Sequence, residues 1–396
     1  MVTDVLTDDP VYDPVSVQSH EDPYPAYARL RDEFPLYYIA RHDVWALSRY
    51  ADVRDALRDW ETFSSAQGVE LGTYVQFFGE GSIQELDPPH HDVLRKVLAP
   101  RFMNKRIKEY EPTVRECAQD LLADLETTGV VDLGTSYTQR LPILTIFRII
   151  GIPDDDIAWA MQAGLEMLSR PPGEDGPSPA AYARRAELVD YMVEQVRRRM
   201  RDGLTDDVLS DIAAAIRDGV MKESEIQGLT LLLIAAGMET TTSLMGNIAN
   251  AVATGLVTAD ALLAEGGELT VPAIEEFLRY DSPAQWLARV TTRPVTLHGT
   301  ELPVGSRVLT IFASANRDPR VFDRADELVL DRDGERTMAF GEGVHFCLGM
   351  PLARVEARVG MSALLQRFPH IRAAGPTVRY PSHVIRGFEH IPVTLG

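Results

Sequence analysis

The amino-acid sequence predicts a mainly α-helical protein with a minor β part. Long segments repeat apolar residues every three or four positions on a charged background, which is the pattern of amphipathic helices. Short alternating runs separated by glycine and proline, typical of small antiparallel strands, are few and gather mainly after residue 282. No internal repeat or clean linker divides the chain, so we expect a single domain over residues 1–396.

Composition excludes several classes of protein. Of the 396 residues, 45% are apolar and 25% are charged, the profile of a folded globular protein. The formal net charge of −20 repels phosphate backbones and anionic lipids, so we expect no nucleic-acid or membrane partner. The longest apolar run, 229–237, is far shorter than the ~18 residues of a membrane span, and no basic and apolar leader opens the chain. These features favour a cytoplasmic protein.

The first half of the chain is predicted to be largely helical. A helix (25–33), a strand (44–47) and a second helix (51–59) alternate near the N-terminus. Long amphipathic helices are then expected over residues 93–126, 154–168 and 180–201. Between the last two, residues 170–179 are rich in proline and glycine, which predicts an exposed, movable loop and a candidate lid.

The second half adds a central helix and the minor sheet. Residues 223–255 lack proline and are apolar on nearly all sides in their first half, which predicts a helix buried in the centre of the molecule. A helix over 272–280 follows. Small antiparallel strands are expected over 290–297, 301–304 and 308–312, and a last helix over 348–366.

The sharpest chemical signal is the segment 340–349, Phe-Gly-Glu-Gly-Val-His-Phe-Cys-Leu-Gly. Its glycines let the backbone approach a flat ligand closely. The helix that follows should lower the pKa of the Cys347 thiol and stabilise a thiolate, which is an axial ligand for iron. A cysteine on its own is more often a small buried hydrophobe, but the pattern around Cys347 is too specific for that interpretation.

Three further segments occur in a fixed order with this one. They are Asp-Pro-Pro-His-His at 87–91 with Arg95, Ala-Gly-Met-Glu-Thr-Thr at 236–241, and Glu-Phe-Leu-Arg at 276–279. Together the four segments resemble the cytochrome P450 superfamily, the haem-thiolate monooxygenases, in its soluble bacterial form. The resemblance implies a helical prism around a buried haem, with small antiparallel sheets.

The resemblance also implies catalytic roles. Cys347 would be the proximal thiolate ligand of the iron of haem b. Glu239 and Thr240 are neighbours on a helix that the family lays over the distal haem face, where they would relay protons to bound oxygen. The alternatives are that Thr240 only bonds its own backbone and that Glu239 is a solvated charge. An acid on an apolar helix is costly unless it is used or paired, which favours a functional role.

Further residues are expected to hold the haem or the fold. His91 and Arg95 lie four residues apart on one helix face, where they would bind haem propionates. The other expected haem contacts are Arg289, His345, Phe340 and Gly341. Spacing puts Glu276 and Arg279 on one helix face as a structural ion pair, and the family adds a second arginine, here Arg332. The segment 325–328 departs from the family's usual pattern at that point.

Electrons are expected to arrive from another protein. The chain has no glycine-rich dinucleotide fingerprint, so NAD(P)H would act only through redox partners such as a ferredoxin and its reductase. Basic residues gather where the family has its proximal surface, a dock for an acidic ferredoxin. They are Arg95, Lys96, Arg101, Lys105, Arg106, Lys108, Arg354 and Arg358. The alternative is an ordinary solvated helix face.

The expected substrate pocket combines a loop, the central helix and the segment after residue 282. Its residues are Leu71, Tyr74, Phe77, Phe78, Leu232, Ala235, Trp286 and Leu287. The aromatic members favour a small, neutral, aromatic substrate that is hydroxylated or O-dealkylated with O2. Alternatives are a peroxide-driven haem oxidase, a hydroxylase of a larger natural product, and a haem-binding sensor without catalysis. The sensor would leave Glu239 and Thr240 without a purpose.

Overall fold

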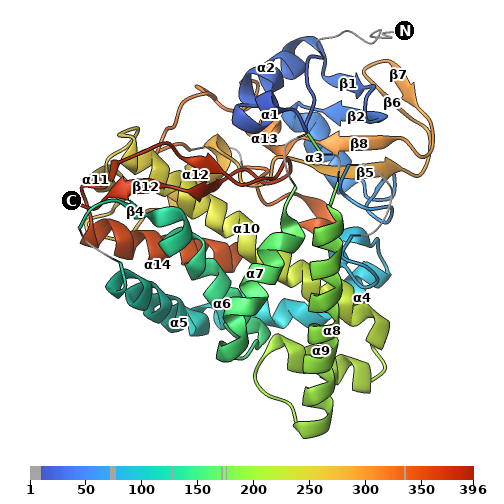
Figure 1. The fold of residues 1–396 in the computed structure, drawn as a ribbon. Helices are drawn as coiled ribbons and strands as arrows, with labels where there is room; N and C mark the ends of the chain where they lie inside the picture. Colours follow the sequence, from blue (N-terminus) through green and yellow to red (C-terminus); the bar gives the residue numbers. More distant parts are fainter. Residues whose placement is uncertain (1–9, 72–76, 126–127, 171–172, 175, 334–335) are drawn as a thin grey trace.

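The structure is a computed structural model that describes residues 10–71, 77–125, 128–170, 173–174, 176–333 and 336–396. Helices make up most of the molecule, and a small sheet with N-terminal helices lies at one end of it (Figure 1). This confirms the predicted mainly α architecture with a minor β part.

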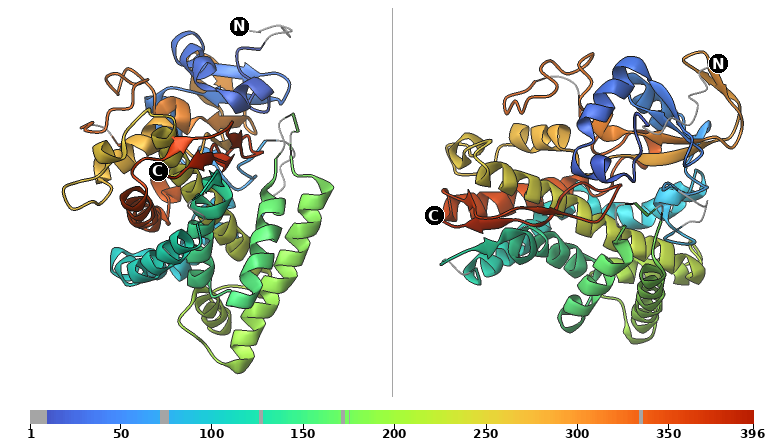
Figure 2. Two further views of the ribbon diagram at one scale, coloured as in Figure 1. Left: turned by 60° about the vertical axis from the view of Figure 1, so that its left-hand side comes forward. Right: turned by 45° about the horizontal axis from the view of Figure 1, so that its top comes forward.

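Helices account for most of the described chain. In the first half they are α1 (Val17–Glu21), α2 (Tyr24–Glu33), α3 (Tyr50–Arg58), α4 (His90–Leu98), α5 (Asn104–Ala123), α6 (Arg140–Ile150), α7 (Ile157–Leu168), α8 (Pro179–Asp202) and α9 (Val208–Arg217). In the second half they are α10 (Ile226–Ala253), α11 (Ala259–Leu262), α12 (Val271–Tyr280), α13 (Phe312–Ala315) and α14 (Met350–Arg367). The long helices α7 and α8 pack side by side (Figure 2).

The strands form one larger and several small sheets. They are β1 (Leu36–Ile39), β2 (Val44–Leu47), β3 (Phe63–Ser64), β4 (Val131–Asp132), β5 (Leu287–Thr291), β6 (Val295–Leu297), β7 (Thr300–Leu302), β8 (Arg307–Thr310), β9 (Arg372–Ala373), β10 (Val378–Arg379), β11 (Phe388–His390) and β12 (Pro392–Thr394). The five-stranded sheet has the order β1-β2-β8-β5-β3. Its β5–β8 pair is antiparallel as expected, but β2 and β8 pair in parallel, with Trp45 opposite Val308.

Two helical predictions need correction. The single helix expected over 93–126 is broken, because α4 ends at Leu98 and a short 3₁₀ turn at Ala99–Phe102 precedes α5. Pro100 lies in that turn, and proline has no N–H to continue an α-helical ladder. The helix α6 was not predicted. Its sequence is apolar on nearly every side, so it lacks the alternation with charge that marks an amphipathic helix.

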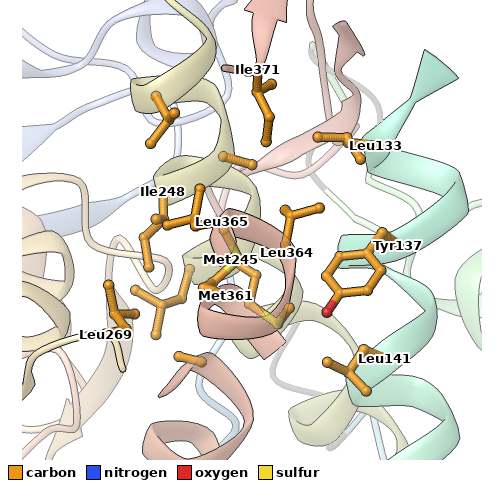
Figure 3. Packing of buried hydrophobic residues seen from close by; sticks show 14 of the residues in the cluster. Leu133, Tyr137, Leu141, Met245, Ile248, Leu269, Met361, Leu364, Leu365 and Ile371 are labelled. Carbon is orange, nitrogen blue, oxygen red and sulfur yellow. The ribbon is translucent and has the colours of Figure 1, made fainter. Parts of the chain in front are cut away.

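The central helix α10 organises the core. Most of its residues are buried, and its C-terminal half packs against α14 and the segment before α6. Met245 and Ile248 from α10 lie against Met361 and Leu365 from α14, with Tyr137 closing the side (Figure 3). Residues 223–253 are long and apolar enough to span a membrane, but 78% of their most apolar window is buried inside the protein. The helix therefore uses its apolar surface for internal packing.

The loop expected to be exposed over 170–179 begins at a buried anchor. Arg170 is only 3% exposed, and its Nη1 donates to the carbonyls of Met167 and Ser169 at 3.0 and 3.1 Å. Its guanidinium also lies 4.5 Å from the ring centroid of Phe77 and 3.4 Å from the Glu70 carboxylate. The expectation of exposure is thus wrong at the first residue of the loop. The side chain of Arg170 contacts the end of α7, Phe77 and Glu70.

Candidate active site

A large cavity lies between α10, β5 and the loop that precedes α14. It contains ≈ 1470 Å³ of empty space, counting the part open to solvent. Cys347 lines it from one side, and Thr240 lines it from α10.

The loop 340–349 presents Cys347 to the cavity. Its shape needs Gly343, which has φ +68°, and a Cβ at that position would lie 2.6 Å from the carbonyl oxygen of Leu57. The amide of Cys347 donates to the carbonyl of Phe340 at 2.9 Å, which closes the loop. Burial raises the pKa of the Cys347 thiol, although the amides of Gly349 and Met350 oppose this shift. The helix N-terminus therefore favours the thiolate as expected, but burial outweighs it.

Cationic and imidazole groups gather at one end of the cavity. Arg289 is buried on β5, donates to the carbonyl of Ala288 at 2.7 Å, and has its pKa lowered to about 10 by burial. Burial also lowers the pKa of Arg95, whose Nη2 donates to the carbonyl of Phe346 at 2.6 Å. His345 has its pKa lowered to about 2, first by burial and then by Arg289.

His91 packs against His345 without lining the cavity itself. Its ring packs edge-to-face on His345 with centroids 4.7 Å apart, and its Nδ1 lies 2.8 Å from Asp92. The cavity is lined by Arg95, Arg289 and His345 but not by His91. The Nε2 atoms of both histidines are buried without a hydrogen-bond partner.

These residues fit a haem. Two guanidinium groups have lowered pKa values, and two buried imidazole nitrogens have no hydrogen-bond partner, so carboxylates such as the propionates of haem would be stabilised here. Phe340 and Gly341 line the same cavity beside Cys347. A sulfur ligand, a flat cradle and a cationic end therefore occur together.

The α10 wall carries the hydroxyl and carboxyl groups. Thr240 lines the cavity, and its hydroxyl donates to the carbonyl of Ala236 at 2.9 Å within the helix. The alternative interpretation was that the Thr240 hydroxyl only bonds the helix backbone. That hydrogen bond is present, but Thr240 also lines the cavity. Thr241 also lines the cavity, and its side chain opposes the rise that burial causes in the pKa of Glu356 on α14.

Glu239 lies beside these residues but is not among those that line the cavity. Burial raises the pKa of its carboxyl to about 8, with the charge of Arg170 opposing the shift and that of Glu70 adding to it. At neutral pH the side chain is therefore mostly protonated. It is a half-buried acid whose pKa responds to the charge of Arg170, and not a freely solvated charge.

Glu356 was not predicted from the sequence. It is 2% exposed, lines the cavity, and has its pKa raised well above the ordinary value by burial. Glu356 lies four residues after Leu352, which also lines the cavity. Residues four apart share a helix face, so this spacing could have indicated that Glu356 faces the cavity.

The carboxylate of Glu276 joins α12 to a distant loop. Arg279 Nε and Nη2 donate to its two oxygens at 2.8 Å each, and Arg332 Nε donates at 2.9 Å. Arg279 also donates to the carbonyls of Ala325 and Glu327. The unusual segment 325–328 therefore binds Arg279 through backbone carbonyls, and this contact does not depend on the identity of its side chains.

Only part of the expected substrate pocket lies at the cavity. Leu232 and Leu287 line it, and Ala235 does not. Trp286 is fully buried elsewhere, with its ring stacked on His383 at 5.7 Å and packed in the same cluster as Leu71. This corrects the expectation that Trp286 and Leu71 form the pocket wall.

The two expected phenylalanines do not line the cavity. Phe77 and Phe78 are buried in a cluster that includes the lining residues Ile146 and Leu233, and their ring centroids are 5.4 Å apart. Tyr74 falls outside the described residues. Where these rings pack depends on distant partners, such as Arg170 and Tyr182 for Phe77.

The basic surface is smaller than expected. Arg101 is 8% exposed and is bound by Asp206 and Asp211, and Arg106 contacts Asp206 and Glu109. This corrects their assignment to a docking face. Arg354 and Arg358 are also paired with acidic residues. The exposed cations of the set are Lys96, Lys105 and Lys108.

Comparison with known proteins decides the family. The family description "Cytochrome P450" matches residues 16–137 and 268–379, more than half of the chain. The chain belongs to the cytochrome P450 family. It is therefore a haem-dependent monooxygenase, and members of its family use a haem-thiolate cofactor, small-molecule substrates and redox partners.

Relatives cover this P450 almost completely. "Putative cytochrome P450 123" of Mycobacterium tuberculosis is 36% identical over 393 residues, 97% of each chain. "Vitamin D(3) 25-hydroxylase" of Pseudonocardia autotrophica is 36% identical and covers 95% of this chain and 94% of its own. The crystal structure of CYP109E1 from Bacillus megaterium in complex with testosterone has a TM-score of 0.87 at 28% identity, covering 96% of this chain and 99% of that one.

Proposed function

We propose that this P450 hydroxylates or O-dealkylates a neutral, mostly apolar small molecule with O2. The observation that carries the proposal is the cavity, in which the thiol of Cys347 and the hydroxyl of Thr240 open onto one space beside apolar side chains. When bound, haem supplies the iron centre at which O2 is reduced and one oxygen atom is transferred.

The chain's own residues would hold the cofactor at both ends. Cys347 provides the thiolate ligand from a loop whose backbone is fixed by Gly343. Arg95, Arg289 and His345 provide donors for the propionates, and His91 orients His345 through ring packing. Phe340 and Gly341 form the adjoining wall. The orphaned imidazole nitrogens support this arrangement, because buried polar groups normally have partners.

Glu239 and Thr240 would deliver protons. Inserting one oxygen atom and reducing the other to water consumes two electrons and two protons in each turnover. The Thr240 hydroxyl lies at the cavity wall, and the Glu239 carboxyl next to it has a pKa of about 8, suited to holding a proton at neutral pH. An enzyme driven by peroxide would not need this supply, so the two residues favour O2.

The substrate wall favours an apolar molecule larger than a simple benzene ring. Between α10 and β5, the lining residues include Leu232, Leu233, Ala284 and Leu287, with no charged side chain among these four. The three aromatic rings that suggested a small aromatic substrate, Phe77, Phe78 and Trp286, do not line this wall. The names of a vitamin D(3) hydroxylase and of a testosterone complex among the relatives agree with a larger neutral substrate.

Electrons would come from NAD(P)H through a ferredoxin-type partner. We assign its dock to Lys96, Lys105 and Lys108, which are exposed on α4 and α5 in a protein of net charge −20. We also infer that residues 1–396 form one domain working in the cytoplasm. The packing of α10 against helices from both halves of the chain supports the first inference.

A binding and turnover panel tests the substrate. The haem-loaded enzyme is titrated with steroids, macrolides, alkoxybenzenes and long-chain fatty acids, and the Soret band is followed for the shift that substrate binding would produce. We expect shifts and oxygenated products with neutral polycyclic or macrocyclic compounds. Binding and turnover only of small aromatic rings or of charged fatty acids would contradict the proposed substrate while leaving the family intact.

A further inference from the structure

A second, smaller cavity lies apart from the haem cavity. It holds ≈ 20 Å³ and is formed by the N-terminal segment around Tyr12 and Tyr27 and by the loop 379–387. None of its lining residues also lines the haem cavity. One water-sized particle needs roughly 10–15 Å³ of such space, so this cavity has room for one small particle.

The charged side chains that line this cavity are arginines, and the carboxylates that act on Arg379, Asp281 and Asp22, lie outside the lining. Among the described residues, its lining includes Arg379, Arg386, His20 and His383 and no aspartate or glutamate. Arg386 is compensated, because its Nε donates to Asp281 at 2.9 Å and its Nη atoms donate to the carbonyls of His20 and Glu21 at 3.0 Å each.

Arg379 is not compensated in this way. Its Nη1 is buried without a hydrogen-bond partner, and its guanidinium carbon lies 4.4 Å from the ring centroid of Phe388. In the part of the chain that the structure describes, no carboxylate forms an ion pair with it. Burial and the charge of Arg386 lower the pKa of Arg379 to about 10, so it still carries its charge at neutral pH.

We propose that this cavity binds one small monovalent anion of about the size of chloride, held by Arg379 Nη1. A buried N–H donor without an acceptor is costly, and an anion supplies both the acceptor and the opposite charge. Water would satisfy the N–H group but would add no negative charge beside Arg379.

The anion would fix the loop that carries Arg379. Within this loop Ile385 forms a β-bridge with Ala284, and Ala284 lines the haem cavity. The loop thus contributes indirectly to the wall of the substrate pocket, and the anion would stabilise the folded loop from its outer side.

Chloride and bromide are the probes that test the site. Melting temperatures of the haem-loaded enzyme are measured in sodium chloride, sodium gluconate and sodium sulfate at equal ionic strength. We expect chloride alone to give a saturable rise of about 1–3 °C, because a ligand that binds only the folded state stabilises it. Crystals soaked in sodium bromide should show an anomalous peak beside Arg379 Nη1.

Two variants separate the site from general salt effects. Arg379→Gln should abolish the chloride-dependent rise. Arg367→Gln removes another arginine that rests on an aromatic ring, with Arg367 5.3 Å from the Phe368 centroid, and should keep the rise. The proposal is overturned by equal melting in chloride, gluconate and sulfate, by an Arg379→Gln variant that keeps the rise, or by a parent crystal without the bromide peak.

Discussion

Arg279 holds Glu276 by two hydrogen bonds of 2.8 Å, and both side chains are only 2% exposed. Arg332 adds a third donor to the same carboxylate. Because these charges are removed from water, each depends on the others for compensation. The cluster therefore controls how α12 is attached to the segment 325–332, which leads on to the cysteine loop.

Removing the charge of Glu276 should destabilise the fold. Glu276→Gln leaves two guanidinium groups buried against a neutral amide, and we expect a loss of about 3–5 kcal/mol in the free energy of unfolding. Urea unfolding of the haem-loaded protein measures it. Glu187→Gln breaks an exposed pair with Arg184 at the same three-residue spacing and should change stability little. Equal effects of the two substitutions would contradict a special role for burial.

Replacing Cys347 should change the haem ligand. The reduced parent with carbon monoxide should show a Soret band strongly red-shifted from that of a histidine-ligated haem, because Cys347 would supply a thiolate ligand to the iron. Cys347→Ser should lose this band. Cys117→Ser is the matched control, since Cys117 is buried beside Arg148 and away from the cavity, and it should keep the band. Loss of the band in the control alone would assign the ligand to Cys117.

Removing the Thr240 hydroxyl should uncouple the reaction. In Thr240→Ala, proton delivery in the cavity is impaired, so electrons should be diverted to hydrogen peroxide and product per NAD(P)H should fall several-fold. Thr242→Ala removes an equivalent bond to the helix backbone, from Thr242 to the carbonyl of Met238, at a residue that does not line the cavity. Coupling that is unchanged in Thr240→Ala, or reduced equally in both variants, would argue against the relay.

Glu239 should make stability depend on pH. Its pKa is raised from 4.5 to about 8 in the folded state, so between these values the folded protein holds a proton that the unfolded chain releases. Stability from this group is present below pH 4.5 and is lost as the pH rises toward 8. Glu239→Gln should therefore raise the melting temperature, more at pH 8 than at pH 5. A gain that is the same at both pH values would contradict the raised pKa.

The lysines should control reduction by a ferredoxin. Lys105→Glu combined with Lys96→Glu should slow electron transfer several-fold at low ionic strength and weaken its salt dependence, with substrate affinity unchanged. Stopped-flow reduction measures this. Lys222→Glu alters another exposed lysine, one that lies near Glu80, and serves as the control. If the control slows reduction as much, the effect belongs to net charge and not to a docking face.

Sequence patterns correctly predicted features that depend on residues close together in the chain. The three-residue spacing of Glu276 and Arg279 places both on one helix turn, and the glycines around Cys347 indicate a close approach of backbone. For Arg101, the local sequence pattern gave the wrong environment. This residue stands among basic neighbours in the sequence, yet Asp206 and Asp211, about a hundred residues away, bury its charge.

Aromatic residues show the same difficulty. Trp286 lies one position before Leu287, which lines the cavity, but successive residues along an extended segment point to opposite sides. Its partner His383 comes from a loop near the C-terminus, so no local signal could place its ring. Whether a side chain faces a cavity or the core depended, in these cases, on contacts across the whole chain.

Because β2 pairs with β8, the five-stranded sheet cannot form during synthesis until β8 has been translated. Trp45 meets Val308, so roughly 260 residues must be translated after β2 before its partner strand exists. At about 5–20 residues per second, the ribosome needs tens of seconds for that length. Throughout this time the hairpin β1–β2 has one edge without backbone partners, and such edges invite pairing with other chains. Truncated or stalled products that end before residue 307 should therefore aggregate, whereas the sheet can close only when synthesis is nearly complete.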